Sequence, residues 1–417
     1  MKRFLAEITI LTLVASILIF YKFNQIPKNL SYDEVEFAKL AISLDKKPYT
    51  PFSSLATGHS TLYFYIILLS FKIFGINNFA LRFPSALFGV LNVLLFYFII
   101  KVSMKEYGNI AIKKWFPFIL SLIFLTSRWY FNFARFSFEA TFLLFLELAS
   151  VYFLFQYLKK RESTGLLLAT VFAGLTFNSY TPGRIFFIIP LVFIVWRVIK
   201  QWSSGTTSNV AGATKQLSLG LFIFLLTVLP LTSYLFTHPD IRFQQQFFIN
   251  NSNESIHRKA EFLWSNIKST VLMFNLKGDV NGRHNYPFKP ALNSVLGVFF
   301  LGGLFLTLKN YKNFYNQFFL LYFVISLIPS ILTYPWENPN MLRTFTVIPS
   351  VVFFAGRAVE FLMGLNLKKT YKKYLVFFIL FLLVSSSIYE IRTYFRYQSK
   401  VFEQAFEVKQ DLETVLK

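Results

Sequence analysis

Three carboxylates stand close together near the N-terminus of a chain that has 42 Lys and Arg residues but only 20 Asp and Glu residues. They are Asp33, Glu34 and Glu36. Ser31 and Glu34 have the spacing of a capping box, and an apolar helical pattern follows them. A carboxylate in the first turn of a helix is stabilised in its ionised form by the helix dipole. Asp33 could therefore act as a general base or a metal ligand, while Glu36 is expected to be a solvated neighbour.

A second group of ionisable residues lies between Ser127 and Glu139. Arg135 and Glu139 are four residues apart, a spacing that would place them on one face of a helix as an ion pair. The surrounding sequence is strongly apolar, where ionisable groups are costly unless they serve a site or a pathway. The pair is therefore either structural or part of a polar site. Glu147, two turns further on, is expected to be a buried structural partner.

Arginines also stand where apolar segments begin or end, at Arg82, Arg184 and Arg343. Snorkelling along an apolar surface explains any one of them taken singly. Several guanidinium groups on one face would instead suit a phosphate, because Arg binds phosphate oxygens through paired hydrogen bonds. Together with Arg135, these arginines are candidate ligands for a substrate phosphate.

Membrane-spanning helices must position these residues, because 55% of the chain is hydrophobic and 20% is aromatic. The net charge of +22 could indicate nucleic-acid binding, but the basic residues fall in short clusters between long apolar runs. We therefore expect membrane lipid as a partner and no nucleic acid. The absence of cysteine excludes disulfides and thiolate metal sites. The sequence requires no cofactor, and it leaves a divalent metal as an open possibility.

The basic loops set the expected orientation. About twelve long apolar segments recur, and if all of them crossed, the loops 101–114 and 159–161 would both face outward, against the positive-inside rule. Treating segment 62–76 as non-spanning places both loops on the cytoplasmic side, and this segment is shorter than the ~20 residues that a span needs. We predict about eleven spans, a cytoplasmic N-terminus, and outer loops at 24–61 and 237–290.

The order of these motifs resembles that of the GT-C glycosyltransferases, in particular the protein O-mannosyltransferase and aminoarabinose lipid A transferase type of glycosyltransferase family 39. The resemblance is carried by "SYDEVEFAKLA", "TGHSTLYFYIILLSFKIFGINNFALRFPSALFGV", "SRWYFNFARFSFEATF" and "NMLRTFTVIP". It covers most of residues 1–200 and, weakly, 318–355. At "GHSTLY" family members often have a charged residue followed by two prolines, whereas here His59 takes the charged position and the prolines are missing.

This resemblance implies an all-α polytopic membrane protein with about 11 transmembrane helices and juxtamembrane helices in the first outer loop. Residues 1–390 would form the membrane glycosyltransferase domain. The charged tail 391–417 would be a short, outward-facing amphipathic segment.

The resemblance also implies sugar transfer, with inversion, from a polyprenyl-phosphate donor to a hydroxyl of a protein, lipid or glycan acceptor. The reaction would occur on the outer face of a plasma or inner membrane. Asp33 would be the general base, and Glu34 would position Asp33 or the acceptor. The donor phosphate would bind Arg343, with Arg184, Arg135 and Arg82 as further ligands. Glu139 and His59 would position the substrate.

Two other functions fit parts of the same pattern. One is a multispan transporter or flippase of an anionic lipid-linked substrate, and the other is a lipid-linked glycan polymerase or ligase. A transporter should place ionisable groups near the middle of several helices, whereas here they crowd one rim. The loop 237–290 is expected to shape acceptor choice, with Asp279 and His284 as solvated loop residues.

Overall fold

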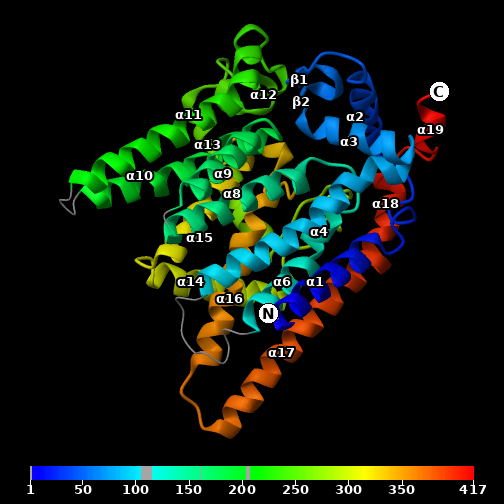
Figure 1. Cartoon of the computed structure of the whole chain (residues 1–417). Coiled ribbons are helices and arrows are strands. Elements are labelled where there is room, and N and C mark those ends of the chain that lie inside the picture. Colours follow the sequence, from blue (N-terminus) through cyan, green and yellow to red (C-terminus); the bar gives the residue numbers. More distant parts are fainter. Residues whose placement is uncertain (1, 105–114, 161, 203–206) are drawn as a thin grey trace.

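The computed structural model describes residues 2–104, 115–160, 162–202 and 207–417, and most of the basic loop 101–114 therefore lies outside the described residues. Helices make up most of the described chain (Figure 1). In chain order the α-helices are α1 (Lys2–Phe20), α2 (Tyr32–Ser43), α3 (Leu62–Phe74), α4 (Asn78–Ser103), α6 (Phe116–Thr126), α7 (Arg128–Phe133), α8 (Ala140–Lys160), α9 (Ser163–Phe177), α10 (Ile188–Trp202), α11 (Thr207–Thr237), α12 (Ile241–Gln246), α13 (Ile256–Asn275), α14 (Ser294–Lys309), α15 (Phe314–Ile331), α16 (Ile348–Gly364), α17 (Lys369–Arg392), α18 (Ser399–Ala405) and α19 (Leu412–Val415).

Short irregular elements join these helices. The 3-10 turns are η1 (Leu55–Thr57), η3 (Thr181–Ile185), η4 (Phe248–Asn250), η5 (Pro335–Glu337) and η6 (Phe345–Val347), and a π-helical turn, η7 (Thr393–Gln398), follows α17. The strands β1 (Phe52–Ser53) and β2 (His59–Ser60) form a two-stranded antiparallel sheet. In its register Ser53 lies opposite His59.

Within the described residues, 8 helices are long and apolar enough to cross a membrane. Four shorter apolar helices, α3, α6, α9 and α14, accompany them. A span needs about 20 residues because the hydrocarbon core is roughly 30 Å thick. The protein is therefore an all-α integral membrane protein, as the sequence predicted, and the count of about eleven spans stays a prediction.

Helix α3 lies along one end of the bundle rather than crossing it. It has 13 residues, and at 1.5 Å per residue it is roughly 20 Å long. His59, before α3, contacts Glu139, and Arg82, after α3, contacts Glu34. Both ends of α3 therefore reach the same group of loops, which is the arrangement that the basic loops predicted for segment 62–76.

The first turn of α2 has the capping box that the sequence predicted. The Ser31 hydroxyl accepts a hydrogen bond from the Glu34 amide, and the Glu34 carboxylate accepts one from the Ser31 amide. Val35, Phe37 and Leu40 are buried on the inner face of the helix. Asp33 stays on the outer face of the same turn.

Loops that are far apart in sequence meet at one end of the bundle, which we call the site end. These loops and the short helices beside them carry Asp33, His59, Glu139, Arg242 and Arg283. His59 contacts both Glu139 and Arg242, and Arg283 forms an ion pair with Asp33. The tail 391–417 also packs here. Val408 pairs with Leu30 as an isolated antiparallel bridge, and the buried Phe402, Phe406 and Leu412 belong to the hydrophobic core. The tail is thus tied to the first loop (Figure 1).

Candidate active site

Asp33 occupies the second position of α2, and its side chain is half exposed. Its Oδ2 atom pairs with Nη1 of Arg283 at 2.5 Å. Arg283 lies in the loop between α13 and α14, 250 residues away in sequence. Of the three neighbouring carboxylates, Asp33 is the one placed both in the field of a helix N-terminus and beside a cation from another loop.

Glu34 faces the opposite way and is fully buried with Arg82. Arg82 donates from Nε to Oε1 at 2.7 Å and from Nη2 to Oε2 at 2.9 Å. The Ser137 amide also donates to Oε1. Arg82 uses its remaining donors on the carbonyls of Pro27 and Asn29. These contacts give Glu34 and Arg82 a structural role, in which they fix the start of α2 against the segment before α8.

Arg135 is also buried, but it does not pair with Glu139 as the spacing predicted. The residues between α7 and α8 are not helical, so the four-residue spacing does not bring the two side chains together. The guanidinium instead donates to the carbonyls of Leu18 and Ile19 at the C-terminal end of α1. It also donates to the Tyr394 hydroxyl. A cation is favourable there because the last carbonyls of a helix lack partners.

Glu139 pairs with His59, and His59 joins it to an arginine that the sequence did not single out. His59 Nδ1 lies 2.9 Å from Glu139 Oε1, and Nη1 of Arg242 lies 2.5 Å from His59 Nε2. Arg has no acceptor, so Nε2 must accept and Nδ1–H must donate to Glu139. Arg242 sits in α12, in a segment whose sequence carries no recognisable motif, and only the chain path brings it to His59.

Two predicted phosphate ligands, Arg184 and Arg343, lie at the site end with part of each guanidinium unengaged. Arg184 pairs with Asp240 at 2.8 Å, and Arg343 pairs with Glu337. The Asp240 side chain also caps α12. Nε of Arg184 and Nη1 of Arg343 are buried and have no hydrogen-bond partner within the described part of the chain.

Tyr180, in the turn before η3, lies among these charged groups. Burial raises the pKa of Tyr180, the Arg242 and Arg343 cations oppose that rise, and Glu139 and Asp33 add to it. The hydroxyl therefore stays protonated at neutral pH and can donate a hydrogen bond. The charges of Asp33, Glu139, Arg242 and Arg343 all lie close enough to Tyr180 to influence its pKa.

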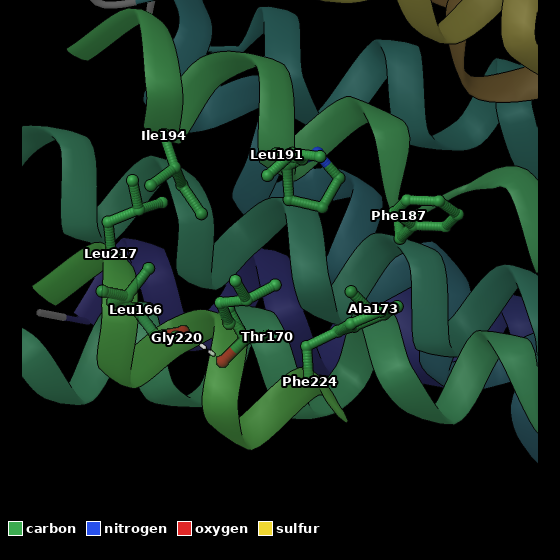
Figure 2. A pocket seen from close by; sticks show the side chains of 11 residues that line it. Leu166, Thr170, Ala173, Phe187, Leu191, Ile194, Leu217, Gly220 and Phe224 are labelled. Atoms are coloured by element: carbon green, nitrogen blue, oxygen red, sulfur yellow. Dashed lines mark hydrogen bonds between the residues drawn. The ribbon is translucent and has the colours of Figure 1, made fainter. Parts of the chain in front are cut away.

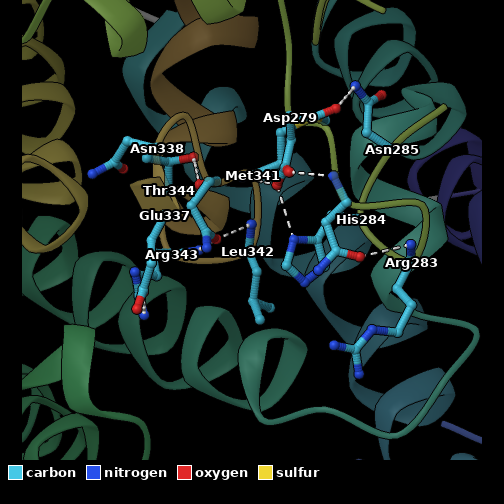
Figure 3. A network of polar contacts seen from close by, with 12 residues as sticks. Asp279, Arg283, His284, Asn285, Glu337, Asn338, Met341, Leu342, Arg343 and Thr344 are labelled. Carbon is cyan, nitrogen blue, oxygen red and sulfur yellow. Dashed lines mark hydrogen bonds and ion pairs between the residues drawn. The ribbon is translucent and has the colours of Figure 1, made fainter. Parts of the chain in front are cut away.

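Asp279 and His284 are buried rather than solvated, so that prediction was wrong. The Asp279 carboxylate accepts hydrogen bonds from His284 Nδ1 and from the Met341 amide, both on Oδ2 (Figure 3). This pair joins the loop before α14 to the segment that carries Arg343. The reason is that this loop packs against residues far away in the sequence, which the polar composition of "GDVNGRHN" does not indicate.

Several buried polar atoms without a partner in the described residues cluster in the same loops. Besides those of Arg184 and Arg343, they are Glu139 Oε2, Ser60 Oγ and Ser179 Oγ. Buried polar atoms are nearly always hydrogen-bonded, so a cluster of exceptions calls for an explanation. A polar ligand at this position would satisfy them. Within the described residues, no three His, Asp or Glu side chains gather closely enough to hold a metal ion.

Comparison with known proteins agrees with this arrangement. Residues 58–234 match the family model described as dolichyl-phosphate-mannose-protein mannosyltransferase. The fold resembles ArnT from Cupriavidus metallidurans in the apo state, with a TM-score of 0.55, 12% identity, and coverage of 96% of this chain and 76% of that chain. ArnT bound to undecaprenyl phosphate gives a TM-score of 0.50 at the same identity and coverage. The chain is a membrane glycosyltransferase with the GT-C fold.

A third solved structure shares this fold. The Archaeoglobus fulgidus oligosaccharyltransferase, tethered to an acceptor peptide that contains the NVT sequon, gives a TM-score of 0.54 and 12% identity. The alignment covers 95% of this chain and 55% of that chain. No curated protein sequence matches the chain.

An apolar pocket opens in this GT-C bundle among α9, α10 and α11 (Figure 2). Its lining includes Ala173 from α9, Phe187, Leu191 and Ile194 from α10 or the residue before it, and Phe224 from α11. Phe187 comes three residues after Arg184, about one helical turn. The pocket therefore begins close to the arginines of the site end.

Proposed function

We propose that this glycosyltransferase transfers a sugar from a polyprenyl-phosphate donor to an acceptor hydroxyl, with inversion at the anomeric carbon. The observation that carries the proposal is the placement of Asp33. It is a half-exposed carboxylate at a helix N-terminus, at the end of the bundle where Arg184 and Arg343 each have a buried N–H without a partner in the described residues. A base on one side and phosphate-binding groups on the other are what an in-line displacement requires.

In this mechanism Asp33 takes the proton from the acceptor hydroxyl as its oxygen attacks the anomeric carbon. The new carbon–oxygen bond forms while the bond from that carbon to the phosphate oxygen breaks. The polyprenyl phosphate leaves with the electron pair of the broken bond. Asp33 then returns its proton to solvent.

The leaving phosphate is an anion and needs donors more than it needs a proton. Arg343 and Arg184, each with an unengaged buried N–H, and Arg242 are the groups that we assign to it. The Tyr180 hydroxyl would add a neutral donor. Arg82 and Arg135 are left out because their guanidinium groups are fully buried and bound to the scaffold.

Glu139 and His59 remain candidates for positioning the substrate. Oε2 of Glu139 is buried without a partner in the described chain, so it can accept a hydrogen bond from a sugar hydroxyl. Glu34 is assigned to the scaffold, where it holds the turn that carries Asp33. The pocket among α9, α10 and α11 is a suitable place for part of the polyprenyl tail.

We further propose that the site end faces the outside and that the N-terminus is cytoplasmic. The support is the excess of Lys and Arg in the loops at the opposite end, such as 309–317 and 368–373. The acceptor would then be a hydroxyl of a protein, lipid or glycan in the cell envelope.

The test compares surface glycans and glycoproteins, by mass spectrometry, in cells with the gene, without it, and with Asp33→Asn. Loss of the same sugar in the last two strains, with the variant present at normal abundance, supports the proposal. Full modification by Asp33→Asn would reject Asp33 as the base. Accumulation of an intact lipid-linked sugar on the wrong side of the membrane would favour the flippase, and loss of polymer length alone would favour the polymerase.

A further inference from the structure

We propose that Arg283 is the positioning residue of the base. It holds one oxygen of Asp33 and leaves the other for the acceptor hydroxyl. This inference rests on the proposed function, because it takes Asp33 as the base. It concerns a residue in the loop between α13 and α14 that no motif marks in the sequence.

The ion pair involves only one of the two carboxylate oxygens of Asp33. Nη1 of Arg283 contacts Oδ2 of Asp33, and within the described chain no other hydrogen bond is made by this carboxylate. Half of the Asp33 side chain is exposed, compared with 23% of the Arg283 side chain. The lone pairs of Oδ1 are thus available for a proton while Oδ2 is held.

The backbone at Arg283 is anchored independently of Asp33. The Arg283 carbonyl accepts a hydrogen bond from Nδ2 of the buried Asn132 at 2.9 Å, and the next carbonyl, of His284, accepts from the same amide. The Arg283 amide donates to Oδ1 of Asn281. The loop conformation at this point is therefore set by α7, which carries Asn132.

Both flanks of Arg283 are fixed as well. Before it, the Asp279 carboxylate accepts hydrogen bonds from Nδ1 of His284 and from the Met341 amide. After it, Nη1 of Arg128 donates to Oδ1 of Asn285. In Figure 3 the Arg283 side chain extends away from the Asp279 and His284 pair. A loop whose backbone is anchored and from which one arginine side chain extends is suited to hold a carboxylate in a defined orientation.

Orientation and charge are both needed by a general base. Displacement of a reacting group by about 1 Å can cost roughly 100-fold in rate. Loss of the Arg283 side chain should therefore lower kcat. The affinity for the donor phosphate should not change, because other arginines bind it.

The test uses the full chain, purified in lipid nanodiscs, with a panel of polyprenyl-phosphate hexoses and pentoses. Envelope extract from cells that lack the gene supplies the acceptor, and release of polyprenyl phosphate is measured. We expect Arg283→Met to lower kcat about 10- to 100-fold with an unchanged donor KM. Arg283→Lys should restore part of the rate. Arg258→Met is the matched control, since Arg258 lies in the neighbouring helix α13 and forms an exposed ion pair with Glu254.

The outcomes separate this inference from the proposed function. An inactive Asp33→Asn together with a normal kcat for Arg283→Met would overturn the inference and leave the function standing. An active Asp33→Asn would reject the function itself.

The double variant Asp33→Asn, Arg283→Met tests whether the two residues act as one unit, and Arg283→Lys supplies the data if Arg283→Met folds poorly. The double variant should be no slower than Asp33→Asn alone, whereas a further loss of rate would show that Arg283 acts independently of the base and would overturn the inference.

Discussion

Two adjacent carboxylates in the first turn of α2, Asp33 and Glu34, have different surroundings. Asp33 is half exposed and meets a cation from another loop, whereas Glu34 is fully buried and bound by Arg82. On a helix, neighbouring residues point about 100° apart, so one turn can serve a site with one residue and a scaffold with the next. From the sequence and its resemblance to GT-C enzymes, Asp33 was predicted to be the base, and Glu34 was predicted to cap the helix and to position Asp33 or the acceptor.

Arg343→Lys should weaken use of the donor. A lysine retains the charge but cannot form the paired hydrogen bonds of a guanidinium with phosphate oxygens. We expect the donor KM to rise about tenfold or more, which corresponds to about 1.4 kcal/mol of binding free energy. Steady-state kinetics with a polyprenyl-phosphate sugar would measure this. Arg258→Lys, at an exposed position of α13, should behave as the unchanged protein, and equal donor kinetics in both variants would remove Arg343 from the phosphate site.

Tyr180→Phe should lower kcat by a modest factor, about 3- to 30-fold. It removes one neutral donor among the arginines while keeping the ring packed against Phe138. The expected signature is a lower kcat with little change in expression or melting temperature. A variant with an unchanged kcat would show that this hydroxyl does not contact the reacting groups.

At the scale of elements, a buried ion pair fixes the position of α2 in the fold. Glu34 and Arg82 connect α2 to α4, and the Ser137 amide connects it to the segment before α8. The capping box could be predicted, because it is local. The partner Arg82 could not be predicted as a scaffold residue, because 48 residues separate it from Glu34.

Glu34→Ala should therefore destabilise the fold more than it changes the chemistry directly. It leaves a buried guanidinium without its counter-charge, which typically costs about 3–5 kcal/mol. We expect a lower melting temperature and a lower yield of the solubilised protein. Glu36→Ala is the control, since Glu36 is exposed and pairs only with Lys39 in the described structure, so its effect should be within about 0.5 kcal/mol. Normal stability of Glu34→Ala would contradict the scaffold assignment.

At the scale of the whole molecule, the bundle has two ends of different character. The site end gathers the segments that carry Asp33, His59, Glu139, Arg242 and Arg283 together with the C-terminal tail, and the opposite end carries lysines such as Lys312 and Lys368. The sides of the membrane and the number of crossings are predicted from charge and segment length alone.

Single-cysteine labelling can test this topology, because the natural chain has no cysteine. Cysteine in place of Lys47, Ile76 or Ser252 should react with a membrane-impermeant maleimide from the outside of intact cells. Cysteine in place of Lys312 or Lys368 should react only after the membrane is opened. The decisive comparison is between Lys47 and Ile76, which lie before and after α3, because labelling of only one of the two from the outside would mean that α3 crosses the membrane.

The sequence by itself determined the class of the protein, the capping box of α2 and the resemblance to GT-C enzymes, and it predicted that segment 62–76 does not cross the membrane. These features depend on composition, local spacing and the order of motifs, which are properties of the linear chain. The tertiary structure alone decided which charged groups lie together at the site end and which are buried in internal contacts. Arg242 and Arg283 lie at the site end, Glu34, Arg82 and Arg135 make buried internal contacts, and Asp279 and His284 are buried, because pairing and burial depend on residues that lie up to hundreds of positions apart.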